Sequence, residues 1–63
     1  MSRTVVSKDG TNQITVEDHG EVGVSIQRRE KSNKGRFVAV EDLLIPRDMF
    51  ASVCRILASL EKP

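Results

Sequence analysis

Residues 21–29 alternate between apolar and polar side chains, and this alternation constrains the fold more than any other feature of the chain. Val22, Val24 and Ile26 occupy every second position, with small or polar residues between them. Successive side chains of a β-strand point to opposite faces, so this pattern predicts a strand with one apolar and one polar face. We therefore expect a sheet that covers a core with only one of its faces.

Three further segments have strand character, and turn residues separate them. Asp9-Gly10 is a strong signal for a tight hairpin turn, Asp18-His19-Gly20 offers a second turn, and residues 32–35 have the composition of a loop. Short loops of this kind join antiparallel neighbours. The sequence predicts a four-stranded antiparallel meander with strands over about residues 3–8, 11–18, 21–29 and 36–41.

A helix is expected after the fourth strand. Glu41-Asp42 interrupts the strand pattern, Pro46 suits the first helical position, and Asp48 complements the helix dipole. Apolar residues then recur at helical spacing to the end of the chain. These signals predict a helix over about residues 46–61. The fold class expected is α+β, with four strands followed by one C-terminal helix, in a single domain spanning residues 1–63.

The length of 63 residues makes the core of a single chain thin. A domain of this size buries about 60% of the surface of its unfolded chain, and one cysteine and one histidine leave little scope for disulfide or metal support. The helix carries an apolar stripe wider than one sheet requires. We expect a homodimer in which two helices pack through Phe50, Val53, Leu57 and Leu60. A monomer whose helix covers only its own sheet is the alternative.

Positive charge is concentrated between residues 28 and 36. This segment carries a net charge of +4, against −2 for residues 1–27 and −1 for residues 37–63, in a chain of net charge +1. Such a cluster attracts polyanions. Its members are Arg28, Arg29, Lys31, Lys34 and Arg36. A solvated hairpin loop without a ligand is the alternative interpretation.

Enzymatic chemistry is not expected. The sequence offers no nucleophile paired with a base, no glycine-rich phosphate loop, and no spacing typical of zinc or calcium ligands. We therefore predict no catalytic residues, no metal and no cofactor. The short apolar runs predict no membrane association, and the lone Cys54 fits a cytoplasmic protein, or a nuclear one if the source is eukaryotic.

The order of these segments resembles a known family. The run from Ile14 to Glu30, the basic loop with Gly35-Arg36, and the proline-started helix are similar to the Positive Cofactor Four family of transcriptional coactivators. The resemblance covers about residues 11–57. It implies four antiparallel strands before one helix, a dimer formed by paired helices, and binding of single-stranded DNA. A phage or bacterial member of the family is one expectation.

The resemblance also implies which residues contact DNA. It assigns contacts to Arg28 and Arg29 at the end of the third strand, to Lys34 and Arg36 around the loop, and to His19 in the turn. Lys31 joins them as a member of the basic cluster. Family members typically carry aromatic residues near the turn and at the end of the third strand, where this chain has none. Stacking here could come only from Phe37, His19 or an arginine plane. Phe37 is expected on the polar face of the sheet, and an edge residue folded under the loop is its alternative interpretation.

These expectations combine into one function and two alternatives. The expected function is binding of single-stranded DNA with weak sequence preference in transcription, replication or recombination, with a protein partner in one of these processes as a further expectation. The leading alternative is a small protein-interaction module or regulator without nucleic-acid affinity. A third reading is a duplex-binding regulator, which requires an exposed strand pair whose side chains reach the bases.

Overall fold

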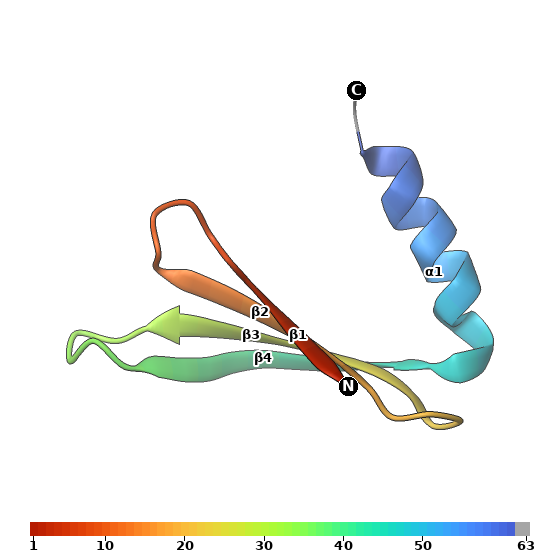
Figure 1. Cartoon of the computed structure of the whole chain (residues 1–63), viewed down its shortest axis with the longest axis horizontal. Helices are drawn as coiled ribbons and strands as arrows, with labels where there is room; N and C mark the ends of the chain where they lie inside the picture. Colours follow the sequence, from red (N-terminus) through yellow and green to blue (C-terminus); the bar gives the residue numbers. More distant parts are fainter. Residues whose placement is uncertain (62–63) are drawn as a thin grey trace.

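The chain folds into one antiparallel sheet followed by one helix, as the sequence predicts. A computed structural model describes residues 1–61, so the last two residues of the predicted domain lie outside the described residues. The sheet has the order β1-β2-β3-β4, with each strand antiparallel to its neighbour (Figure 1). Its elements are β1 (Ser2–Val6), β2 (Asn12–Asp18), β3 (Gly23–Lys31), β4 (Phe37–Pro46) and α1 (Arg47–Leu60).

Side-chain hydrogen bonds fix the turn between β1 and β2. One carboxylate oxygen of Asp9 accepts hydrogen bonds from the Ser7 hydroxyl at 2.7 Å and from the Thr11 N–H at 3.0 Å. Gly10 follows with a φ of +76°, a backbone conformation that glycine adopts without steric cost. The Ser7 hydroxyl, the Thr11 N–H and the Thr11 hydroxyl, in that order of effect, lower the pKa of Asp9 from 3.8 to about 2. The Asp9 carboxylate is thus the centre of this turn.

The fourth strand is longer than the sequence predicts. It continues through Glu41 and Asp42 to Pro46, so these acidic residues do not end the strand, and Pro46 caps the helix rather than beginning it. A β-bulge shifts the register, because Arg28 lies opposite Glu41 whereas Arg29 lies opposite Ala39. Val40 is the extra residue of this bulge. The shift places Phe37 opposite Lys31, on the same face as Arg29.

The register gives the sheet two chemically different faces. Residues directly opposite one another in antiparallel strands share a face. On this basis the apolar face consists of Val5, Ile14, Val16, Val24, Ile26, Leu43 and Ile45. The polar face includes Thr4, Thr15, Glu17, Ser25, Gln27, Arg29 and Asp42. This division confirms the two-sided character that the alternation predicts for residues 23–29. The third strand begins and ends two residues later than predicted, so Val22 lies in the turn before β3 and is exposed.

Helix α1 leaves the sheet at a steep angle and covers little of it. Its first turn contacts the apolar face, where Val16, Val24 and Phe50 line an open hollow of about 380 Å³. Beyond this turn the helix extends away from the strands (Figure 1). The helix has no buried residues, and Ile56, Leu57 and Leu60 keep 56–68% of their surface exposed.

The core of the isolated chain is therefore very small. Among residues 1–61, only Val24 and Ile45 are buried apolar side chains, at 4% and 7% exposure. The chain exposes 5354 Å². A compact protein of 7.0 kDa would expose about 4,000 Å². Exposed apolar side chains of the sheet, such as Val5 and Leu43, and of α1, such as Leu60, contribute to this excess.

Candidate nucleic-acid interface

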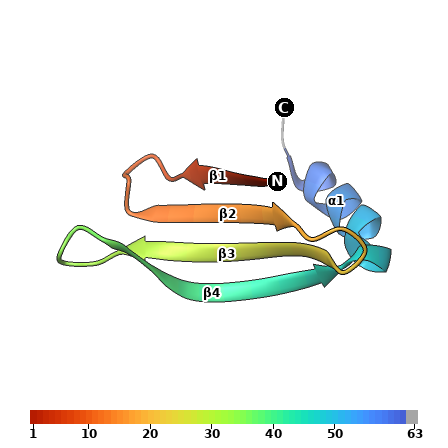
Figure 2. The same ribbon diagram turned by 60° about the horizontal axis from the view of Figure 1, so that its bottom comes forward.

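Five cationic side chains gather at the end of the sheet opposite α1, and we call this group the basic end. The loop between β3 and β4 contributes Lys34 and Arg36, and its hairpin is closed by a hydrogen bond from the Ser32 N–H to the Arg36 carbonyl at 2.6 Å. The turn between β1 and β2 lies at the same end of the sheet (Figure 2). The Lys31 N–H donates to the Thr11 carbonyl at 2.8 Å and so ties the two turns together. The members of the basic end are Lys8, Arg29, Lys31, Lys34 and Arg36.

The cations of the basic end have no acidic partners among the residues that the structure describes. Within residues 1–61, ion pairs involve other side chains, and none of the five takes part in one. Arg29 donates one hydrogen bond from Nε to the Gln27 side-chain oxygen at 2.7 Å, which leaves its terminal nitrogens available. A cation without an acidic partner in the protein can attract an external anion more strongly than a paired one.

Lys8 is a member of this group that the sequence reasoning did not select. It lies in the turn beside Asp9-Gly10, 20 residues before the predicted cluster begins. A meander brings its first and third turns to the same end of the sheet, because consecutive strands run in opposite directions. The predicted strand order therefore contained the signal that could have identified Lys8.

Arg28 does not join the basic end, although the sequence groups it with Arg29. It lies on the apolar side of β3, opposite Ile14 of β2 and Glu41 of β4. Its guanidinium pairs with Glu41 and with Glu30, the latter at 2.6 Å, and donates to the Asn12 side-chain oxygen at 2.8 Å. Glu30 first and Glu41 second raise the pKa of Arg28. Two carboxylates thus offset its charge.

His19 and Phe37 lie at opposite ends of the polar face. Phe37 is half-buried opposite Lys31, next to the basic end. His19 lies close to the other end of β3, where its Nε2 is 2.9 Å from the Ser25 hydroxyl and 3.8 Å from a Glu17 oxygen. Of the seven sequence-predicted contact residues, five lie at or next to the basic end: Arg29, Lys31, Lys34, Arg36 and Phe37.

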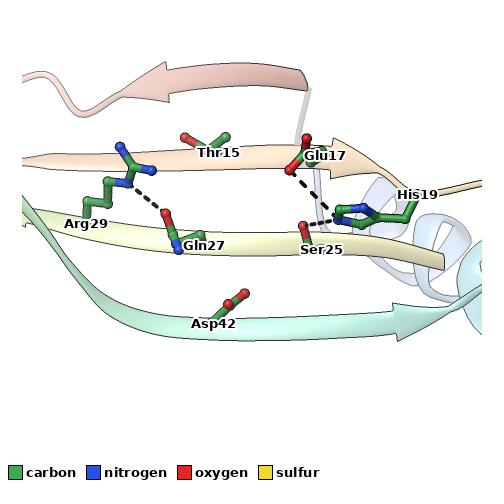
Figure 3. Close-up of a pocket in the computed structure, with 7 residues that line it drawn as sticks. All are labelled: Thr15, Glu17, His19, Ser25, Gln27, Arg29 and Asp42. Carbon is green, nitrogen blue, oxygen red and sulfur yellow. Dashed lines mark hydrogen bonds and ion pairs between the residues drawn. The ribbon is translucent and has the colours of Figure 1, made fainter. Parts of the chain in front are cut away.

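A shallow polar hollow of about 330 Å³ joins His19 to Arg29 along the middle of the polar face. Figure 3 shows its side chains, which come from β2, β3, β4 and the turn after β2. They are Thr15, Glu17, His19, Ser25, Gln27, Arg29 and Asp42. With Glu17 and Asp42 in its lining and Arg29 at one end, this hollow is less positive than the basic end.

Arg47 links the end of the sheet next to α1 to the first turn of the helix. Its guanidinium donates to the Gly20 carbonyl at 2.8 Å, pairs with Asp18, and lies 5.2 Å from the centre of the Phe50 ring. The Gly20 N–H, followed by Arg47, lowers the pKa of the Asp18 carboxyl. Arg47 therefore joins the turn after β2 to the start of the helix and is not a free cation.

The described residues contain neither a cluster of metal-ligating side chains nor a membrane-spanning helix. Within residues 1–61, no three side chains of the metal-ligating types His, Cys, Asp and Glu converge on one point. In the same part of the chain, α1 falls short of the length and apolar character needed to cross a bilayer.

Neither the known protein families, nor curated proteins, nor solved structures gave a match to this sequence or fold.

Proposed function

We propose that the protein binds single-stranded DNA through the basic end of its sheet, as a homodimer joined through α1 and with weak sequence preference. The observation that carries the proposal is that five cations from two turns and one strand lie at one end of the sheet without an ion-pair partner among residues 1–61. Lysine and arginine side chains neutralise phosphates and release condensed counterions, which provides affinity without sequence recognition. The likeness to the Positive Cofactor Four family in the order of strands, basic loop and helix supports the same reading.

The chemistry of the sheet favours a single strand over a duplex. Phe37 lies beside Lys31 and offers a ring on which an unpaired base can stack. The polar hollow next to Arg29 offers hydrogen-bonding groups to base edges, which a single strand exposes. A phosphate backbone at the basic end would leave its bases directed along the polar face.

The dimer is supported by the apolar surface that one chain leaves open. The exposed area exceeds that of a compact chain of this mass by about 1,300 Å². Stable homodimers bury about 1,000 Å² or more from each partner. Of the four predicted interface residues, Leu57 and Leu60 are exposed on α1, beside Met49 and Ile56, and a second α1 could cover them. Phe50 and Val53 are half-buried, and Phe50 lines the hollow on its own sheet.

An anisotropy titration tests the DNA-binding proposal. A labelled mixed-sequence oligonucleotide should bind at low salt and be released at high salt, and unlabelled single strands should compete better than duplex of the same sequence. The variant R29A/K31A/K34A/R36A should lose at least about tenfold in affinity at low salt, with an unchanged circular dichroism spectrum. No binding by the parent protein at low salt would leave the protein-interaction module as the better explanation.

A further inference from the structure

We infer that the polar hollow accepts a cytosine of the bound strand, with Asp42 and Gln27 reading its pairing edge. This inference rests on the proposed function, since it concerns the base that lies on the sheet once the phosphates occupy the basic end. It adds a preference between bases to a surface otherwise proposed to bind any single strand.

Charge decides which part of a nucleotide can enter the hollow. Glu17 and Asp42 are two of its seven lining residues, and both are exposed carboxylates. A phosphate placed between them would be repelled, because like charges at short range are unfavourable. A neutral base carries no such penalty, so the hollow suits a base and the basic end suits the backbone.

The hydrogen-bonding groups in the hollow are arranged in a definite order. Asp42 of β4 and Gln27 of β3 are direct cross-strand partners, and Arg29 follows Gln27 on the same face of β3. Figure 3 shows the Asp42 carboxylate beside Gln27, with the Arg29 guanidinium on the other side of Gln27. Asp42 has no hydrogen-bond or ion-pair partner within residues 1–61. Its acceptors are therefore open.

Gln27 is oriented as a donor towards this space. Its side-chain oxygen accepts from Arg29 Nε at 2.7 Å, which leaves its NH₂ group as the free end of the amide. The terminal nitrogens of Arg29 are donors as well. From β4 towards the basic end, the hollow thus presents an acceptor followed by two sets of donors.

Cytosine matches this order and thymine does not. The pairing edge of cytosine has the amino group N4 as a donor, followed by the acceptors N3 and O2. The N4 amino group would donate to Asp42, a pairing that carboxylates make with cytosine, while N3 and O2 would accept from Gln27 and Arg29. Thymine would direct its O4 acceptor at the Asp42 carboxylate, and its N3–H would meet the Gln27 NH₂ group.

The test compares two pyrimidine homopolymers of equal length, oligo(dC) and oligo(dT), at neutral pH and fixed salt. The parent protein should bind oligo(dC) about five- to tenfold more tightly than oligo(dT). In Asp42→Asn this ratio should fall towards one, mainly because oligo(dT) binds better once the carboxylate charge is absent and an amide can donate to O4. Glu21→Gln is the matched control, because Glu21 has the same charge but lies outside the hollow, and its ratio should equal the parent ratio.

The outcomes separate this inference from the proposed function. Equal binding of the two homopolymers by the parent protein would overturn the cytosine site and leave single-strand binding intact. A preference that persists unchanged in Asp42→Asn would also overturn it, because the preference would then arise elsewhere on the surface. Binding of neither homopolymer would remove the proposed function and this inference together.

Discussion

Arg28 and Arg29 are neighbours in the chain but lie on opposite faces of β3, and of the two Arg28 alone pairs with acidic side chains among residues 1–61. Arg28 contacts Glu30, Glu41 and Asn12, whereas within the described part of the chain the Arg29 side chain donates to Gln27 alone. The two arginines are therefore expected to have different roles. This separation gives the most direct test of where the ligand lies.

Replacement of each arginine by alanine should separate the two roles. Arg29→Ala should weaken binding of a mixed-sequence oligonucleotide severalfold at low salt, because one unpaired cation is lost from the basic end. Arg28→Ala should leave the affinity nearly unchanged but lower the midpoint of urea unfolding, because Glu30 and Glu41 lose their common partner. DNA titrations of both variants measure the affinity, and urea unfolding curves measure the stability. A larger loss of affinity in Arg28→Ala than in Arg29→Ala would place the ligand on the other face.

The affinity should depend strongly on salt. With about three to five phosphate contacts per subunit, the slope of log K against log salt concentration should be roughly −2 to −3.5 for a single strand. Lys8→Ala should make this slope shallower by less than one unit, because it removes one cation of the basic end. Titrations at a series of salt concentrations give both slopes. A slope near zero would exclude phosphate contacts as the source of affinity.

Charge placed on the exposed apolar side of α1 should disrupt the dimer. Leu57→Asp should yield monomers or unfolded chains in sedimentation experiments, because a carboxylate cannot be buried without a partner. Ser59→Asp is the matched control on the same helix and should leave the assembly intact. If the parent protein sediments as a folded monomer, the proposal of a dimer is wrong.

Gly23 should tolerate no side chain. Its φ is +143°, and a Cβ at this position would lie 2.1 Å from the Ile45 carbonyl oxygen, so the backbone of β4 would have to move. Gly23→Ala should therefore lower the free energy of unfolding by at least about 2 kcal/mol. Gly20→Ala is the control, because Gly20 has a φ of +67° but open space around it, and it should cost only about 1 kcal/mol. Similar losses in both variants would contradict the close contact with β4.

Acid should weaken the fold through its carboxylates. The pKa of Asp9 is lowered from 3.8 to about 2, and the pKa of Asp18 is lowered as well. A lowered native pKa gives stability that is complete above pH 3.8 and is lost as the pH falls through the native value. The thermal midpoint should drop as the pH falls from about 4 to about 2. Asp9→Asn keeps an acceptor oxygen and does not titrate, so its midpoint should fall less over this range; an identical fall would mean that Asp9 does not contribute.

Element order could be predicted from the sequence because each strand and the helix have their own local signal. The alternation in residues 21–29, the turns at Asp9-Gly10 and Asp18-His19-Gly20, and the loop at residues 32–35 together predict the meander. The end of β4 was predicted too early, since Glu41 and Asp42 look like a break when their partners are unknown. In the sheet, Glu41 lies opposite Arg28 and is an ion-pair partner, and Asp42 stands on the polar face.

The candidate site was only partly predictable for a related reason. Charge counting identified the segment 28–36, but it treats all cations alike and cannot distinguish a free arginine from one held by two carboxylates. The partners of Arg28 come from β2, β3 and β4, and only the register brings them together. The polar hollow depends equally on register, because its seven residues are spread over positions 15–42.

Because the isolated chain has a very small hydrophobic core, the amount of folded protein in a cell should depend on its concentration. With Val24 and Ile45 as the buried apolar side chains of residues 1–61, a partner that covered α1 and the apolar face of the sheet would supply much of the hydrophobic stabilisation. If a second copy does so, folding becomes a bimolecular event, and the folded fraction rises with the amount synthesised. At low concentration the unfolded chains would then be open to proteases, whereas at high concentration dimer formation would protect them.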